Sequence, residues 1–192
     1  MNERFHYYII SILTIIASGL YIVTDVIEGM VGGFLPFQLI LTYFAMATLS
    51  LAYLGLYAVN YRKGGATYLI GSVIFSLSYI YFAHSALLAL FVGSAEYSGL
   101  KETAGLMYEI HGYATTVGGL LIGYVILRKK LFPAWTGIVL VLTIILNVFT
   151  FLMGLADIYQ LILNTCRNIA FIGMGCHVFT LAKQLDFGET GK

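Results

Sequence analysis

The sequence predicts an all-α integral membrane protein, a bundle of six transmembrane helices with both termini in the cytoplasm. Of its 192 residues, 60% are hydrophobic and only 10% are charged, whereas soluble domains contain about 45–50% apolar residues. The apolar residues form long stretches, each close to the ~20 residues that a helix needs to cross the hydrocarbon core. Cations gather in alternate connecting segments, as the positive-inside rule requires of a multi-pass protein.

The predicted spans are separated by short polar or glycine-containing segments. They lie near residues 7–28, 36–60, 67–92, 104–127, 133–153 and 158–182. The first stretch is counted as a span because it is too long for a signal-peptide core and has no small-residue cleavage site after it. The connecting segments are too short to fold independently, so we expect residues 1–192 to form a single membrane domain.

The positions of the cations predict the orientation. With the N-terminus inside, the outer loops hold only Lys101, and Arg167 lies within a span. The cytoplasmic segments hold the remaining cations: Arg4, Arg62, Lys63, Arg128, Lys129, Lys130, Lys183 and Lys192. Because Lys and Arg are retained on the cytoplasmic side, we expect a multi-pass protein of the cell (plasma) membrane with both termini cytoplasmic.

Charge and motif content exclude several functions. The formal net charge is +1, so the chain has no basic field with which to bind nucleic acid. No CxxC, HExxH or glycine-rich phosphate-binding motif occurs. Cys166 and Cys176 lie nearly three turns apart in one predicted helix, too far to form a disulfide with each other.

Polar side chains inside the predicted spans are the candidates for a functional site, because an ionisable group in hydrocarbon is costly and marks a site by default. We expect the ligand-binding residues to be Asp25, His84, Glu109, His111, Asn147, Asn164, Arg167 and Asn168. All are predicted in the outer halves of their spans. They indicate a polar pocket that faces outward.

Helical spacing predicts which of these residues face the interior, since residues three and four apart share a face. In the first span, polar side chains recur at such steps at Ser11, Thr14, Ser18, Tyr21, Asp25 and Glu28. Another such face in the last span carries Gln160, Asn164, Arg167 and Asn168. Glu109 and His111 are two positions apart and therefore point about 200° apart, so they are not expected to meet one target directly.

Arg167 is the most informative of these residues, because a guanidinium stays charged and a buried one requires an anionic partner. Asp25 and Glu109 are its candidate partners. One interpretation is a structural ion pair between helices. The other is that Arg167 holds an anionic group of a ligand or tunes a neighbouring acid.

His84 and His111 are expected at similar depth in adjacent helices, an arrangement that suits a divalent metal or haem b. The segment Tyr108-Glu109-Ile110-His111-Gly112-Tyr113 resembles the haem-bearing helices of membrane b-type cytochromes and haem A synthase, in which a His opens a Gly-rich span. That resemblance implies haem ligation by His111. It covers one span only, so no family is assigned from it.

These patterns favour a membrane protein that binds or translocates a small solute or ion. A membrane-embedded enzyme or b-type cytochrome that uses the His and carboxylate cluster is an alternative. A third is a structural, immunity or assembly subunit, in which the polar residues join helices and small-residue faces bind a second copy or a partner membrane protein. The expected partners are thus the lipid bilayer, a small ligand and possible protein subunits.

Overall fold

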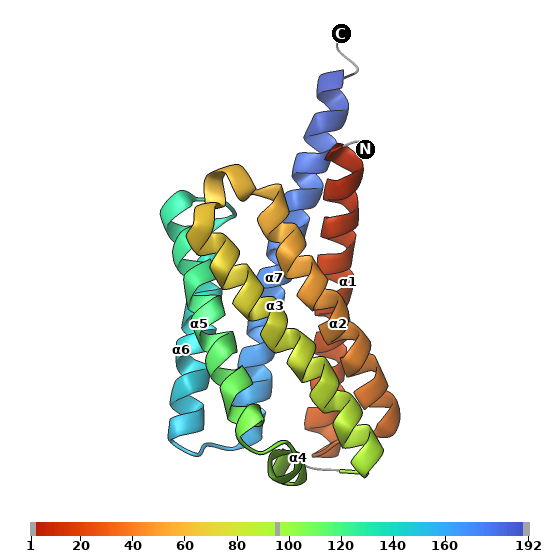
Figure 1. The fold of residues 1–192 in the computed structure, drawn as a ribbon. Helices are drawn as coiled ribbons and strands as arrows, with labels where there is room; N and C mark the ends of the chain where they lie inside the picture. The colour runs from red at the N-terminus through yellow and green to blue at the C-terminus, as the bar shows by residue number, and fades with distance from the viewer. Residues whose placement is uncertain (1–2, 95–96, 190–192) are drawn as a thin grey trace.

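The computed structural model describes residues 3–94 and 97–189, and all regular secondary structure in these residues is helical. The helices are α1 (Glu3–Val31), α2 (Pro36–Val59), α3 (Tyr61–Val92), α4 (Tyr97–Ala104), α5 (Leu106–Lys129), α6 (Ala134–Leu152) and α7 (Asp157–Glu189). The long helices run up and down along one axis, and the short α4 crosses one end of the bundle (Figure 1). Both chain termini lie at the opposite end.

The long helices form a closed ring. Each packs against two neighbours, in the order α1, α2, α3, α5, α6 and α7, and the contact of α7 with α1 closes the ring. Within this ring α3 and α5 approach closely through glycines. A Cβ added to Gly118 would lie 2.8 Å from the amide nitrogen of Phe75 and 3.0 Å from the carbonyl oxygen of Gly71. A small residue is therefore required at Gly118.

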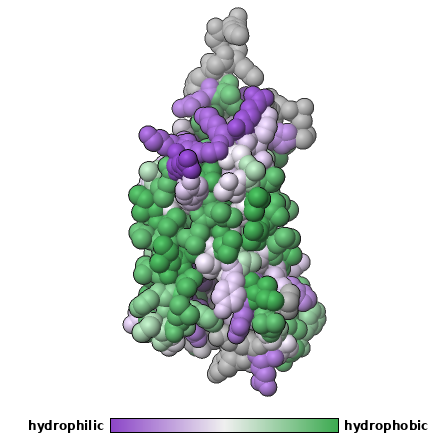
Figure 2. Space-filling view, turned by 60° about the vertical axis from the view of Figure 1, so that its left-hand side comes forward, coloured by the Kyte–Doolittle hydropathy of each residue, from purple (hydrophilic) through white to green (hydrophobic). Residues whose placement is uncertain are grey.

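Among the described residues, length and composition identify five helices that are able to cross a membrane: Arg4–Val31, Pro36–Val59, Tyr61–Val92, Tyr108–Lys129 and Ala134–Leu152. A belt of apolar side chains surrounds the middle of the visible face, with hydrophilic side chains gathered mainly at the end where the chain termini lie (Figure 2). The predicted all-helical membrane fold is consistent with these features. The number of six spans and the cytoplasmic location of both termini remain predictions.

The helix α7 is not among the five. Its interior contains Arg167, Asn168 and His177, which lower its hydropathy although it packs along the whole bundle. Two boundaries also differ from expectation: α3 starts before the predicted third span, with a kink at Gly65 (φ 71°), and α7 continues past residue 182. The short helix α4 lies in the connecting segment between the predicted spans 67–92 and 104–127.

Aromatic side chains fill the middle of the bundle. Tyr53 packs against Phe75, Tyr79 and Phe171, with ring centroids 4.8, 5.0 and 4.5 Å away. All four side chains are buried. They separate the end of the bundle that holds the polar cavity described below from the end that holds the chain termini.

Candidate functional site

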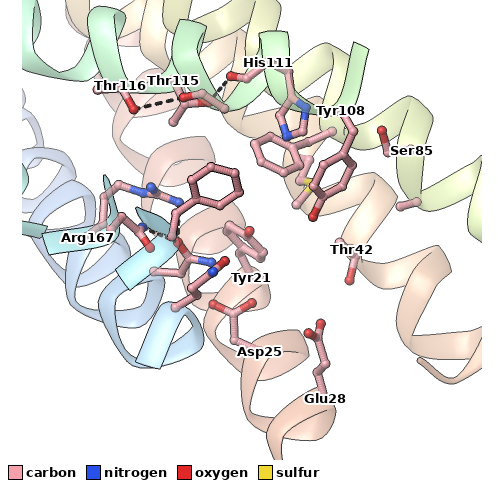
Figure 3. Close-up of a pocket in the computed structure, with 18 of the residues that line it drawn as sticks. Tyr21, Asp25, Glu28, Thr42, Ser85, Tyr108, His111, Thr115, Thr116 and Arg167 are labelled. Carbon is pink, nitrogen blue, oxygen red and sulfur yellow. Dashed lines mark hydrogen bonds between the residues drawn. The ribbon is translucent and has the colours of Figure 1, made fainter. Parts of the chain in front are cut away.

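A polar cavity of about 210 Å³ opens inside the end of the bundle opposite the chain termini. It is lined by side chains from α1, α2, α3, α5, α6 and α7. Figure 3 shows how these side chains converge: Tyr21, Asp25 and Glu28 from α1 and Arg167 from α7 lie on one side, and Tyr108 and His111 from α5 on the other. All the long helices of the ring therefore contribute to one site.

Two acidic side chains of α1 form one part of the wall. Asp25 is only 4% exposed, and its Oδ2 has no hydrogen-bond partner among the described residues. Glu28 is also buried, and its Oε2 lies 3.4 Å from the donor Nε2 of Gln38 on α2. The same Nε2 lies 3.2 Å from Thr42 Oγ1. Glu28 is thus tied to α2, whereas Asp25 presents an unpaired oxygen in a buried position.

Arg167 forms another part of the wall and is likewise 4% exposed. Its Nη2 donates a hydrogen bond of 2.8 Å to Asn164 Oδ1, which also accepts one of 3.2 Å from Asn147 Nδ2 on α6. The guanidinium carbon lies 5.9 Å from the ring centroid of Tyr79. The Nε atom has no hydrogen-bond partner in the described part of the chain.

The expected ion pair of Arg167 is not formed directly. Within residues 3–94 and 97–189, neither Asp25 nor Glu109 bonds to the guanidinium, although Asp25 and Arg167 are close enough to interact electrostatically. The amide of Asn164 and the π-face of Tyr79 surround the cation instead. The cavity therefore contains a buried acid and a buried base, each with an unsatisfied polar atom.

His111 is held by aromatic side chains. Its ring is 5% exposed and stacks on Tyr81, with centroids 5.2 Å apart. Phe82 and Tyr108 meet it edge-on at 3.9 and 5.0 Å. One turn further along α5, Thr115 Oγ1 lies 3.0 Å from Ser78 Oγ on α3. These contacts fix the imidazole at the α3–α5 face of the cavity.

The structure brings together most of the predicted site residues. Those that line the cavity are Asp25, Glu109, His111, Asn147, Asn164 and Arg167. Glu109 is exposed and His111 buried, as their angular separation on the helix implies. Asn168 is fully buried next to the site, where its Nδ2 donates to the carbonyl oxygen of Asn164 at 3.0 Å.

His84 lies elsewhere. Its side chain is exposed on α3 and does not line the cavity that contains His111. Tyr81 packs near both rings, 6.3 Å from His84 and 5.2 Å from His111. The two imidazoles therefore do not line this cavity together. Among the described residues, no group of three or more His, Cys, Asp and Glu side chains is placed to hold a metal ion.

Sequence reasoning did not select Glu28, Gln38, Thr42 and Tyr108 as site residues, although all four line the cavity. Glu28 continues the polar face of α1, so its spacing was a usable signal. Gln38 is a single amide in the first turn of an apolar helix. A lone polar residue at a helix end has no periodic pattern, and only the packing of α2 against α1 reveals its role.

The fold and the cavity together define the class of a helical membrane protein with a polar site enclosed by its helices. No known protein family, curated protein or solved structure matches this chain. What the site does must therefore be argued from its own geometry.

Proposed function

We propose that this chain is a six-span protein of the cell membrane that binds a small polar solute in this cavity. Six spans require that α7 also crosses the bilayer. Its packing against α1 and α6 supports this, because a helix enclosed on two sides is able to bury Arg167 and Asn168 away from lipid. In this arrangement both termini lie on one side of the membrane.

The proposed orientation places the cavity on the outer side. At the end with the chain termini, the exposed cations include Arg62, Lys63, Arg128 and Lys129, and cationic segments stay in the cytoplasm. Tyrosines accompany them: Arg62 lies 5.5 Å from the ring of Tyr61, and Arg128 donates a hydrogen bond to the Tyr124 hydroxyl. Such pairs suit a membrane interface.

The observation that carries the proposal is the unsatisfied pair of charged groups. Asp25 Oδ2 and Arg167 Nε are both buried, both belong to side chains that line the cavity, and neither has a hydrogen-bond partner in the described residues. An unpaired buried polar group costs about 1–3 kcal/mol, and more when charged. A solute that bonds to these atoms would recover that free energy, so the site is suited to ligand binding.

The small size of the cavity and the aromatic cluster beyond it favour a binding site over an open pore. A volume of about 210 Å³ is smaller than the ~300–1,000 Å³ of pockets for drug-sized ligands. The cluster of Tyr53, Phe75, Tyr79 and Phe171 fills the bundle beyond it. Translocation would require this cluster to open, so the closed cluster supports solute binding rather than passage through the bundle.

The test is a solute screen on purified protein in detergent, with thermal unfolding as the readout. Gly112 lines the cavity, and a Cβ placed there would meet nothing within 4 Å. Gly112→Leu should therefore fill the cavity without displacing its neighbours. Gly19 on α1 is equally open but does not line the cavity, so Gly19→Leu is the matched control.

Solutes that raise the melting temperature of the parent and of Gly19→Leu should have no effect on Gly112→Leu. A solute effect of equal size in all three proteins would place binding outside this cavity and contradict the proposal.

A further inference from the structure

We infer that the solute is a small zwitterion with an ammonium group, a carboxylate and an apolar side chain, such as an α-amino acid. This inference rests on the proposed function and specifies its ligand. It is drawn from the two unsatisfied atoms of the cavity, from the balance of charge around them and from the apolar part of the wall.

The acidic part of the wall favours an ammonium group. Asp25 Oδ2 is an acceptor without a donor among the described residues, and the neighbouring Glu28 adds a second carboxylate on the same face of α1. An ammonium carries three donors and no acceptor. Placed between α1 and the cavity centre, it would donate to Asp25 without competing with the bond from Gln38 to Glu28.

The basic part of the wall favours a carboxylate. Arg167 is fixed by its bond to Asn164 and by the ring of Tyr79, so its fork is held in one orientation. Its Nε remains without an acceptor in the described residues. A guanidinium matches a carboxylate in plane and charge better than it matches other acceptors. A carboxylate is therefore the natural acceptor for this group.

A ligand with only a positive or only a negative charge does not pair with both Asp25 and Arg167. A simple cation near Asp25 would face the positive charge of Arg167, and a simple anion on Arg167 would leave Asp25 unpaired and face the carboxylates of Glu28 and Glu109. A zwitterion satisfies both atoms and adds no net charge to a low-dielectric site, where uncompensated charge is most costly.

Part of the remaining wall suits an apolar side chain. Besides hydroxyl and amide side chains such as Thr42 and Asn147, the lining includes the apolar residues Leu39, Met46, Phe82, Ile144, Val148 and Phe151. These apolar residues offer no hydrogen-bonding side-chain group except the weak sulfur acceptor of Met46. The small volume limits the ligand to one compact side chain.

The experiment compares three molecules that share the isobutyl side chain of leucine: leucine itself, 3-methylbutylamine, which lacks the carboxylate, and 4-methylpentanoic acid, which lacks the ammonium. Binding to the purified protein is measured by calorimetry in detergent. Leucine should bind at least about tenfold more tightly than either analogue, since each loses a hydrogen bond to a charged group. Equal affinity for leucine and one analogue would overturn the inference.

Two variants assign the ends of the ligand. Asp25→Asn should remove the higher affinity for leucine than for 4-methylpentanoic acid. Arg167→Gln should remove the higher affinity for leucine than for 3-methylbutylamine. Because the parent protein alone tests the class of ligand, a variant that does not fold leaves the comparison decisive. If leucine does not bind to the parent protein, and glycine, alanine and phenylalanine do not bind either, the zwitterion inference is wrong. The proposed function is judged separately, by the effect of Gly112→Leu in the broader screen.

Discussion

Asn164 Oδ1 accepts hydrogen bonds from Arg167 Nη2 on its own helix and from Asn147 Nδ2 on α6, at 2.8 and 3.2 Å. A single amide oxygen thus connects the buried cation of α7 to the neighbouring helix. These two donors fix the orientation of the side-chain amide of Asn164. The position of Arg167 in the cavity therefore depends on Asn164 as much as on any acid.

Replacing Asn164 by Ala should destabilise the protein by about 1.5–3 kcal/mol, because a charged donor and an amide donor lose their acceptor in a partly buried place. Equilibrium unfolding in detergent measures the effect. Asn60→Ala is the control, since its amide makes only a 3.5 Å bond to the carbonyl oxygen of Leu56 at the other end of the bundle. Equal losses in the two variants would show that Asn164 does not hold Arg167.

Arg167→Met should cost a similar amount, about 1.5–3 kcal/mol, because it removes the charged donor to Asn164 Oδ1 and a positive charge that interacts electrostatically with Asp25. Adding Asp25→Asn should recover part of the loss, since the two charges interact without direct contact. A double-mutant cycle on unfolding free energies measures this coupling. Strictly additive effects would mean that Asp25 and Arg167 are energetically independent and that the shared-cavity argument fails.

Gly118→Ala should destabilise the bundle by about 1–3 kcal/mol, because the added methyl group would meet backbone atoms of α3 that cannot move aside. Gly19→Ala adds the same methyl group where nothing lies within 4 Å. It should be neutral or slightly stabilising, since Ala favours helix over Gly. Melting temperatures of the two variants give the comparison, and similar values would contradict the close α3–α5 contact.

The proposed topology predicts which side of the membrane each end of the bundle faces. In a protein with Cys166 and Cys176 changed to Ser, the exposed residues Lys63 and Glu102 are replaced one at a time by Cys. An impermeant thiol reagent added to intact cells should label Glu102→Cys at once and Lys63→Cys only after permeabilisation. The reverse pattern would invert the orientation, and labelling of both from outside would contradict the span count.

The inward faces were predictable because helical spacing is a local property. Ser11, Thr14, Ser18, Tyr21, Asp25 and Glu28 repeat at steps of three and four on α1, and all are buried. The bond from Asn147 on α6 to Asn164 on α7 was not predictable, since it depends on how the two helices meet. His84 shows the same limit: a single polar residue on α3 has no periodic partner to reveal that it points outward.

Apolar length supports five of the six predicted spans among the described residues, those in α1, α2, α3, α5 and α6, but not the last predicted span, which lies in α7. The residues that lower the hydropathy of α7, above all Arg167 and Asn168, are the ones buried at or beside the cavity. A helix that supplies polar groups to an intramembrane site must lose hydropathy to do so. Its assignment as a span therefore depends on packing rather than composition.

The most direct test of the central claim is whether water reaches the cavity. Thr116 lines it, whereas the adjacent Val117 is 49% exposed on the outer face of α5. In the protein without native cysteines, Thr116→Cys should react from outside with a small charged methanethiosulfonate, because only a hydrated thiol ionises to the reactive thiolate. Val117→Cys, facing lipid, should react far more slowly. Equal rates, or an unreactive Thr116→Cys, would contradict a solute-binding cavity.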